Sequence, residues 1–217
     1  MQKKKTTYAV FGLGRYGSAV ARELVEHGKE VLAVDFDQKI VNDAAAYLPV
    51  CKCADVTDPE VIDRLGIGNI DTVIVCMASN LESSVMAITL CKEAGVQTVI
   101  AKCASEMHQK ILLRIGADQV VFPENESGVR LAKNLLSSGF IDMISLSKDV
   151  SMVEIDVRDE WVGKNLIELN LRKKYGFNIV AVKKSEKVTV NINPEQPLNA
   201  DMTLIVIANV TKLGKLK

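Results

Sequence analysis

Three glycines near the start of the chain constrain its fold more than any other feature. The stretch GLGRYG at residues 12–17 follows a short apolar run, residues 7–11, and precedes a helical pattern. Gly12 permits a tight turn, Gly14 lets a phosphate group approach the backbone, and Gly17 lets the helix pack closely on the strand. The first N–H groups of such a helix face an anion, aided by the helix dipole. The spacing therefore predicts a nucleotide-binding strand–loop–helix unit.

An acidic residue ends the next predicted strand and strengthens this interpretation. Asp35 follows the glycine loop by roughly 20 residues, where a carboxylate accepts hydrogen bonds from ribose hydroxyls. A carboxylate at this place repels a 2′-phosphate, so NADP is disfavoured. A plain glycine turn with a helix-capping Asp35 is the alternative.

The loop also carries a cation. Arg15 is a planar five-donor group suited to a terminal phosphate oxygen, which favours ATP or ADP over a dinucleotide. A solvated arginine at a helix start is the alternative role. Tyr16 is the next residue of the loop, and we assign it to the same site.

Polar residues follow three further predicted strands, at the sheet edge where ligands bind in such folds. Asp55 follows the third strand, and Ser79 and Asn80 follow the fourth, so they are candidates for contacts with adenine and ribose. Lys102 closes the fifth strand and is a candidate for a phosphate contact. Helix capping, or a lysine whose stem covers apolar surface, explains these residues equally well.

Hydrophobic periodicity predicts an α/β fold with two domains. Residues 1–123 alternate short β-branched runs with helical periods, which is typical of a Rossmann-type doubly wound parallel sheet. The six strands are predicted at residues 7–11, 30–34, 50–54, 72–76, 98–102 and 119–122.

A linking region, residues 124–149, follows and begins with a predicted helix over 124–136 that ends at residues 137–139. Residues 150–217 predict a small α+β domain, and dimerisation through it is expected because a single core of this size is marginal. Its strands are predicted at residues 152–157, 178–182, 187–190 and 203–208, and its helix at 164–174.

Charge and apolar run lengths exclude two classes of partner. Lys plus Arg and Asp plus Glu both number 27, so no overall field attracts nucleic acid, and no basic helix-turn-helix is present. The apolar runs are far shorter than the roughly 20 residues that a membrane span needs, so no direct membrane insertion is expected. The five cysteines lack zinc-site spacing and predict small buried side chains in a reducing compartment. We therefore expect a cytoplasmic protein.

The residues expected of an enzyme are not evident. The two histidines, His27 and His108, lie outside any recognisable catalytic pattern. The short-chain dehydrogenase pattern Tyr-x-x-x-Lys, the nucleophile motif G-x-S-x-G and the P-loop motif G-x-x-x-x-G-K-[ST] are absent from the sequence. A nucleotide that is bound but not consumed fits better, as an allosteric ligand. An NAD(H)-dependent oxidoreductase or redox-sensing Rossmann protein is the alternative.

Glu124 begins the linking helix, where a carboxylate has a default capping role. A second role arises if two nucleotide sites face each other across a dimer. Their crowded phosphates need cations, which Arg15 and a divalent ion near Glu124 can supply.

The chain resembles a known family along nearly its whole length. The stretches VFGLGRYG at 10–17, VLAVD at 31–35 and IGAD at 115–118 resemble the N-terminal domain of regulator-of-potassium-conductance (RCK) proteins. The stretches LNLR at 169–172 and YGFNIVAV at 175–182 resemble the TrkA-type C-terminal domain of the same family.

The resemblance implies the cytosolic gating subunit of a bacterial Ktr-type potassium uptake system. It implies dimers in an octameric ring, docked on a membrane transporter subunit and gated as ATP and ADP exchange. It assigns Gly12, Gly14 and Arg15 to phosphates, Asp35 to ribose and Glu124 to a cation between paired sites.

Some family members also bind cyclic di-AMP at a C-terminal dimer interface. The matching positions, whose alternative role is ordinary packing beside an exposed arginine, are Leu171, Arg172, Asn178, Ile179 and Pro194.

Overall fold

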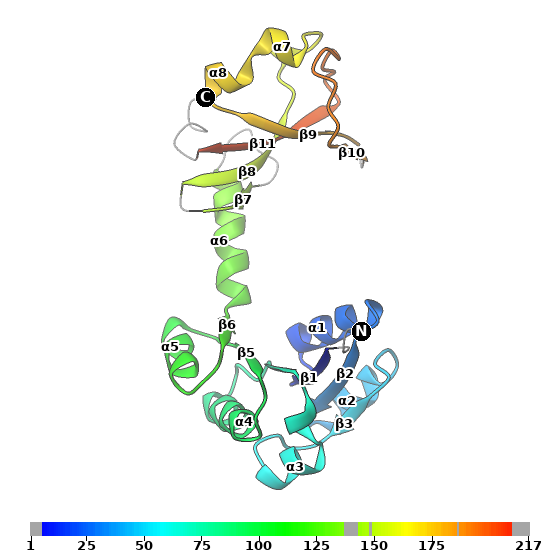
Figure 1. The fold of residues 1–217 in the computed structure, drawn as a ribbon, viewed down its shortest axis with the longest axis vertical. Coiled ribbons are helices and arrows are strands. Elements are labelled where there is room, and N and C mark those ends of the chain that lie inside the picture. The colour runs from blue at the N-terminus through cyan, green and yellow to red at the C-terminus, as the bar shows by residue number, and fades with distance from the viewer. Residues whose placement is uncertain (1–5, 137–142, 148, 186, 210–217) are drawn as a thin grey trace, which may run out of the picture. The chain divides into compact units, whose positions relative to one another are not determined.

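The computed structural model describes residues 6–136, 143–147, 149–185 and 187–209. The chain forms two compact units, residues 1–124 and 125–217, and each is described by itself (Figure 1). No helix within the described residues is both long and apolar enough to span a lipid bilayer.

The first unit is built on a six-stranded parallel sheet with the order β3-β2-β1-β4-β5-β6. This is the order of dinucleotide-binding folds, in which the chain reverses direction across the sheet between β1 and β4. Every predicted strand is present with each end within one residue, so the Rossmann-type fold is confirmed. The strands are β1 (Thr7–Phe11), β2 (Glu30–Asp35), β3 (Cys51–Cys53), β4 (Thr72–Val75), β5 (Thr98–Lys102) and β6 (Gln119–Val121).

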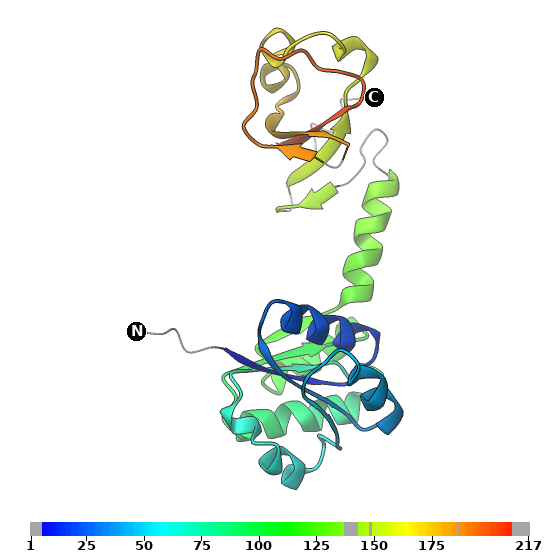
Figure 2. The ribbon, with the colours of Figure 1, turned by 90° about the vertical axis from the view of Figure 1, so that its right-hand side faces the viewer.

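Helices cover both faces of this sheet (Figure 2), because successive strand side chains point to opposite faces. In β1, Ala9 and Phe11 enter one apolar core, and Val10 enters the other. Helices α3 (Pro59–Arg64), α4 (Leu81–Glu93) and α5 (Glu106–Arg114) supply buried residues to the first core. Helices α1 (Arg15–Glu26) and α2 (Gln38–Ala44) supply them to the second, and a short 3₁₀ turn spans Ile67–Asn69.

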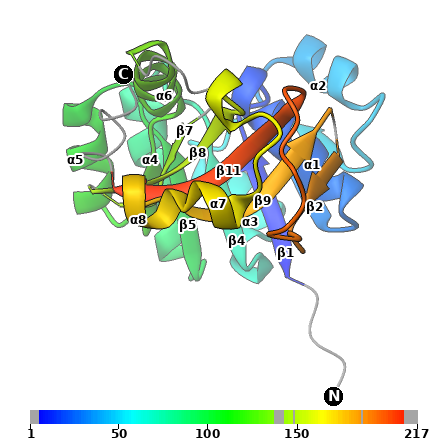
Figure 3. The same ribbon diagram turned by 90° about the horizontal axis from the view of Figure 1, so that it is seen from above.

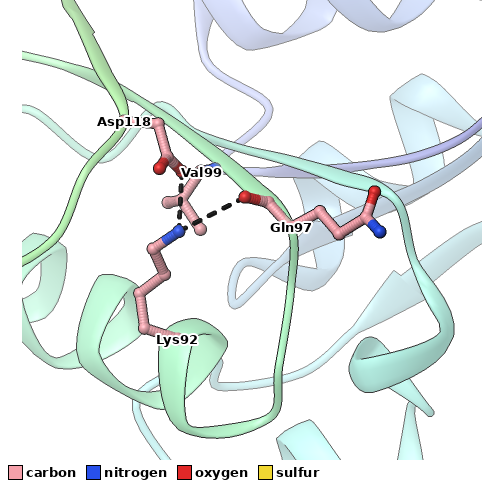
Figure 4. Close-up of polar contacts among 4 residues, drawn as sticks. All are labelled: Lys92, Gln97, Val99 and Asp118. Carbon is pink, nitrogen blue, oxygen red and sulfur yellow. Dashed lines mark hydrogen bonds and ion pairs between the residues drawn. The ribbon is translucent and has the colours of Figure 1, made fainter.

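Carboxylates close the amino-terminal edge of this sheet. Asp71, just before β4, accepts hydrogen bonds from the backbone N–H and the hydroxyl of Thr7 on β1, at 2.9 and 3.0 Å. Asp118, just before β6, accepts from Val99 N on β5 at 2.6 Å and from Lys92 Nζ on α4 at 2.7 Å. Lys92 Nζ also donates to the carbonyl oxygen of Gln97 at 3.4 Å (Figure 4). These bonds tie strand ends and one helix to each other.

The second unit contains helix α6 (Pro123–Leu136) for most of its length, and this helix matches the predicted one; its predicted end at residues 137–139 lies outside the described residues. An antiparallel sheet follows, with the order β10-β9-β11-β8-β7. Its strands are β7 (Met143–Ser145), β8 (Val150–Asp156), β9 (Asn178–Lys184), β10 (Lys187–Thr189) and β11 (Met202–Asn209). The short β7 was not predicted. Helices α7 (Leu166–Leu169) and α8 (Leu171–Tyr175) lie on one face of this sheet (Figures 1 and 3), and a 3₁₀ turn spans Asp159–Trp161.

The single helix predicted over residues 164–174 is wrong. Asn165 and Glu168 form a reciprocal capping box that begins α7. Asn170 then adopts a left-handed conformation with φ of 44°, which asparagine tolerates better than most residues and which ends α7. The segment therefore forms two short helices, and the second ends at Gly176.

The prediction that all five cysteines are buried is also wrong. Cys91 and Cys103 are buried, while Cys51 and Cys76 are half-buried. Cys53 is exposed because β3 is the edge strand of its sheet.

Candidate nucleotide site

A cavity of about 560 Å³ opens at the carboxyl-terminal edge of the first sheet. Its walls come from the loops after β1, β2, β3 and β4, around the point where the strand order reverses. The volume lies within the range of roughly 300–1,000 Å³ that is typical of small-molecule sites. Six residues predicted for the nucleotide site line it: Gly12, Gly14, Asp35, Asp55, Ser79 and Asn80.

The glycine loop has the geometry of a phosphate cradle. Gly12 has φ of +86°, and a Cβ atom there would approach Met77 Cγ to 2.9 Å. A Cβ atom on Gly17 would overlap the carbonyl oxygen of Gly12, so α1 packs against the loop only with glycine at this position. Gly14 differs, because a Cβ atom there meets nothing within 4 Å. Open space thus lies beside Gly14, the N-cap of α1, which has no side-chain cap.

Asp35 holds the loop to β2. It is only 7% exposed; its Oδ2 accepts a hydrogen bond from Leu13 N at 2.6 Å, and its Oδ1 accepts from Asp37 N at 2.9 Å. Each carboxylate oxygen can accept a second hydrogen bond. The side chain can therefore fix the loop and still receive hydroxyl donors from the cavity that it lines.

The polar residues after β3 and β4 have local partners. Asp55 Oδ1 accepts from the hydroxyl and the backbone N–H of Thr57, at 2.7 and 2.9 Å, and these bonds lower the pKa of Asp55. Asn80 caps α4, since its Oδ1 accepts from Ser83 N at 3.1 Å. Asn80 therefore has the helix-capping role that the sequence analysis gave as the alternative to a ligand contact. Ser79 lines the cavity beside it.

Four predicted residues do not line the cavity. Gly17 lies beneath the loop, where it is buried. Arg15 is exposed at the start of α1, next to the half-buried Tyr16. Lys102, at the end of β5, has its Nζ 5.8 Å from the centre of the Tyr16 ring.

The predicted phosphate lysine and the predicted cation ligand are joined in one ion pair. Lys102 Nζ lies 2.6 Å from Glu124 Oε1; the lysine side chain is 16% exposed and the glutamate side chain 63%. The hydrogen bond from Lys102 is the main cause that lowers the pKa of Glu124, and the charge of Arg15 contributes less. Lys102 and Arg15 therefore place positive charge near Glu124 in the first turn of α6, and we call these two residues the cationic cluster.

Within the described ranges, no group of three or more His, Cys, Asp or Glu side chains is placed to hold a metal ion. One chain thus offers Glu124 as a single carboxylate, already paired with Lys102. This donor set fits a divalent cation only when phosphate or water oxygens supply the remaining ligands.

Sequence reasoning missed several residues of the cavity wall, among them Phe36, Cys76 and Met77. Phe36 is 78% exposed directly after Asp35, so its position at a strand end was the available signal. Cys76 and Met77 follow β4 and have the same positional signal, but their apolar side chains did not suggest a ligand contact. Burial raises the pKa of Cys76 to about 12, and the nearby charge of Lys102 opposes this effect.

The five residues matched to a cyclic di-AMP site have different environments. Leu171 is 2% exposed and belongs to the core of the second unit. Arg172, Asn178 and Pro194 are exposed, and Ile179 is half-buried. The carboxyl end of α8 is closed just before β9, because Phe177 N donates to the carbonyl oxygen of Leu171 at 3.4 Å.

Comparisons with known proteins identify both units. Residues 8–123 match the TrkA-N domain and residues 150–217 match the TrkA-C domain. Ktr system potassium uptake protein C of Bacillus subtilis is 37% identical over 97% of this chain and 96% of its own length. Ktr system potassium uptake protein A of the same organism is 34% identical over 95% and 93%.

Solved structures share the fold. All of this chain superposes on 39% of the GsuK channel chain with a TM-score of 0.70, and on the same share of the GsuK channel bound to NAD with 0.65, at 17% identity in both cases. The likeness to these structures shows the fold alone. The matches over the whole length to the two Ktr proteins, together with both domain models, show that this chain belongs to the TrkA/Ktr family of potassium uptake regulatory proteins.

Proposed function

We propose that this chain gates a separate membrane potassium transporter as ATP and ADP exchange in the carboxyl-edge cavity of its first unit. The observation that carries the proposal is the open space in front of Gly14 and α1, within reach of a ribose-binding carboxylate, Asp35. Relatives that match the whole chain are potassium uptake proteins, which supports the physiological setting.

The cavity offers a distinct contact for each part of an adenine nucleotide. Ribose hydroxyls donate to Asp35, and the phosphates lie over Gly12 and Gly14 at the amino terminus of α1. The base lies against the exposed ring of Phe36, since aromatic faces stack on bases. Asp55 and Asn80 border the same space and contribute polar edges.

The ATP-sensing element in this proposal is the cationic cluster beside the cavity. A terminal phosphate that extends beyond Gly14 reaches toward Arg15 and Lys102, and ADP lacks that phosphate. Lys102 then has two competing anions, the phosphate and Glu124. Because Glu124 lies in the first turn of α6, this competition links ligand identity to the helix that leads out of the first unit. A ligand that favours one pairing over the other shifts the population of states.

A divalent cation and a second copy of the chain complete the proposed site. Glu124 would hold the cation together with phosphate oxygens, and the cation supplies positive charge where two phosphate groups crowd. The paired sites then belong to dimers that assemble into an octameric ring. The ring docks on its transporter subunit at the cytoplasmic face of the membrane.

Two titratable groups of the cavity support binding without turnover. General acid–base catalysis at neutral pH needs a pKa near 7. The pKa of Asp55 is lowered by its bonds to Thr57, and that of Cys76 is raised by burial to about 12. NAD(H) is the alternative ligand, because a structure that shares this fold is described as bound to NAD. NADH binding tighter than that of ATP, with reductase turnover, would favour the alternative of an oxidoreductase or redox sensor.

A second proposed ligand, cyclic di-AMP, rests on the resemblance at Leu171, Arg172, Asn178, Ile179 and Pro194. A ligand that binds only the folded state raises the melting temperature by mass action. We expect cyclic di-AMP to raise the melting temperature of the full chain, and Arg172→Ala to remove most of this shift. A melting temperature that does not change at saturating cyclic di-AMP would contradict this proposal.

The gating role is tested by potassium flux into proteoliposomes that contain a Ktr-type membrane subunit with and without this protein. We expect flux to depend on the added protein and to differ between ATP and ADP. The matched variant is Gly14→Val, whose side chain fills the open space beside the loop and should make potassium flux insensitive to the nucleotide. Equal flux with ATP, ADP and no nucleotide would reject nucleotide gating.

A further inference from the structure

A second cavity, of about 450 Å³, lies in the second unit and has no part in the function proposed above. It is bordered by the end of β9, by β10 and by the segment 191–198, which returns to β11 past α7 (Figure 2). None of the five residues matched to cyclic di-AMP lines it.

The floor of this cavity is apolar and anchored. Leu198 and Met202 are 3% and 6% exposed and belong to the core of the unit. Backbone bonds fix the segment 191–198, because Leu166 N donates to Pro194 O at 3.1 Å and Leu198 N donates to Lys164 O at 2.9 Å. The cavity is thus formed before any ligand arrives, as is usual for small-molecule sites.

The charged side chains among the described residues of the wall are two lysines, Lys184 and Lys187. Lys184 and Lys187 are direct cross-strand partners in the β9–β10 hairpin, and like charges placed opposite each other destabilise a sheet. Lys184 Nζ lies 3.0 Å from Asp201 Oδ2, whereas no carboxylate among the described residues pairs with Lys187. Among the described residues that line the cavity, none is an aspartate or a glutamate. An anion between the two lysines would relieve their repulsion.

Neutral hydrogen-bonding groups complete the lining. Asn191, Asn193 and Gln196 place three side-chain amides around the apolar floor. Asn193 Oδ1 accepts from Glu195 N at 3.0 Å, which orients this amide and leaves its NH₂ group as a donor. Such groups suit the polar edges of a flat ring or a sugar.

We infer that this cavity binds a phosphomonoester with a body about the size of a nucleoside. The phosphate, which carries close to two negative charges at neutral pH, lies between Lys184 and Lys187. Its body covers the floor formed by Leu198 and Met202, with polar edges on the amides. This site is separate from the carboxyl-edge cavity and does not depend on nucleotide gating.

Two methionines allow each cavity to be observed in the full-length protein. Met202 lines this cavity, and Met77 lines the carboxyl-edge cavity. The protein is labelled with ¹³C at the methionine methyl groups and followed by NMR. Uridine monophosphate is titrated into it, and uridine and inorganic phosphate are titrated in parallel. We expect uridine monophosphate to move the Met202 resonance saturably at millimolar concentration, and uridine or phosphate alone to move it far less.

Variants test the role of the lysine. Lys187→Ala should weaken the binding seen at Met202 by about tenfold, because it removes a charge-assisted contact. Lys187→Gln keeps a polar side chain without the charge and should weaken the binding similarly, which guards against a folding defect. Lys174→Ala, on exposed α8 outside the lining, should bind as the wild type does.

The inference is overturned if uridine monophosphate leaves Met202 unmoved, or if both Lys187 variants bind as tightly as the wild type. A Met202 response to uridine equal to that of its phosphate would also overturn it. An ATP titration followed at Met77 tests the carboxyl-edge cavity separately, so either proposal can fail without the other.

Discussion

The two edges of the first sheet each carry a lysine–carboxylate pair, and the pairs differ in what surrounds them. At the amino edge, Lys92 and Asp118 are 2.7 Å apart, and Asp118 also accepts the backbone N–H of Val99 (Figure 4). At the carboxyl edge, Lys102 and Glu124 are 2.6 Å apart, beside Tyr16 and a ligand-sized cavity.

The difference lies in the backbone. Asp118 satisfies a buried strand N–H, so its loss would leave a polar group of the fold unpaired. Glu124 has a hydrogen bond to a side chain, Lys102, and is largely exposed. The amino edge therefore uses charge to close the sheet, and in our proposal the charge at the carboxyl edge serves a ligand.

The largest loss of stability is expected from a substitution in the glycine loop at the carboxyl edge. Gly17→Ala forces a methyl group into the carbonyl oxygen of Gly12, and overpacking of this kind costs about 1–3 kcal/mol or more. Thermal unfolding should show a clear loss of stability. Gly14→Ala is the matched control, since its methyl group enters open space and should leave stability nearly unchanged. Equal melting of the two variants would show that the loop does not pack tightly on α1.

The second prediction compares how much each ion pair contributes to the free energy of unfolding. Asp118→Ala should destabilise the protein by about 2 kcal/mol, mainly because the buried Val99 N–H loses its partner. Glu124→Ala should cost less than about 0.5 kcal/mol, because exposed ion pairs contribute little. Urea unfolding measures both values. A larger loss for Glu124→Ala would reverse the roles assigned to the two edges.

The third prediction concerns how Arg15 distinguishes ATP from ADP by the charge of the terminal phosphate. Arg15→Ala should weaken ATP binding about tenfold while changing ADP binding much less, because the terminal phosphate alone reaches the arginine. Calorimetric titration of both nucleotides gives the ratio. Lys39→Ala, which removes an exposed cation outside the cavity lining, should leave both affinities unchanged. Equal losses for ATP and ADP would place Arg15 on an inner phosphate.

The smallest effect is a pH dependence at the amino edge. Burial raises the pKa of Asp118, but hydrogen bonds from Lys92 and Val99 outweigh it, so the net pKa falls below its ordinary value of 3.8. A lowered carboxyl pKa contributes stability above the unfolded value and loses it as pH falls through the folded value. Wild type should therefore exceed Asp118→Asn in stability at neutral pH, with the gap closing below about pH 4. A gap independent of pH would mean that the Asp118 charge is not stabilising.

Sequence predicted the parts of this fold that depend on local pattern. The strands of the first sheet were found within one residue, because buried parallel strands are short apolar runs bounded by turn residues. The break at Asn170 was missed, since no glycine or proline interrupts residues 164–174 and a left-handed asparagine leaves no distinct signal.

The candidate site was predictable where chemistry lies at strand ends. Asp35, Asp55 and Asn80 follow strands and line one cavity, as topology requires. The pairing of Lys102 with Glu124 could not be predicted, because it joins residues far apart in sequence and depends on side-chain directions. The packing that leaves Phe36 exposed and Cys76 half-buried is likewise a tertiary property.

Calorimetric titration of ATP and ADP into the purified protein tests the central claim most directly. We predict saturable binding of both nucleotides at micromolar concentration in the wild type and in Asp118→Asn, and its loss in Gly14→Val. Binding that survives in Gly14→Val, or a wild-type protein that gives no heat with either nucleotide, would contradict the assignment of the carboxyl edge as the nucleotide site.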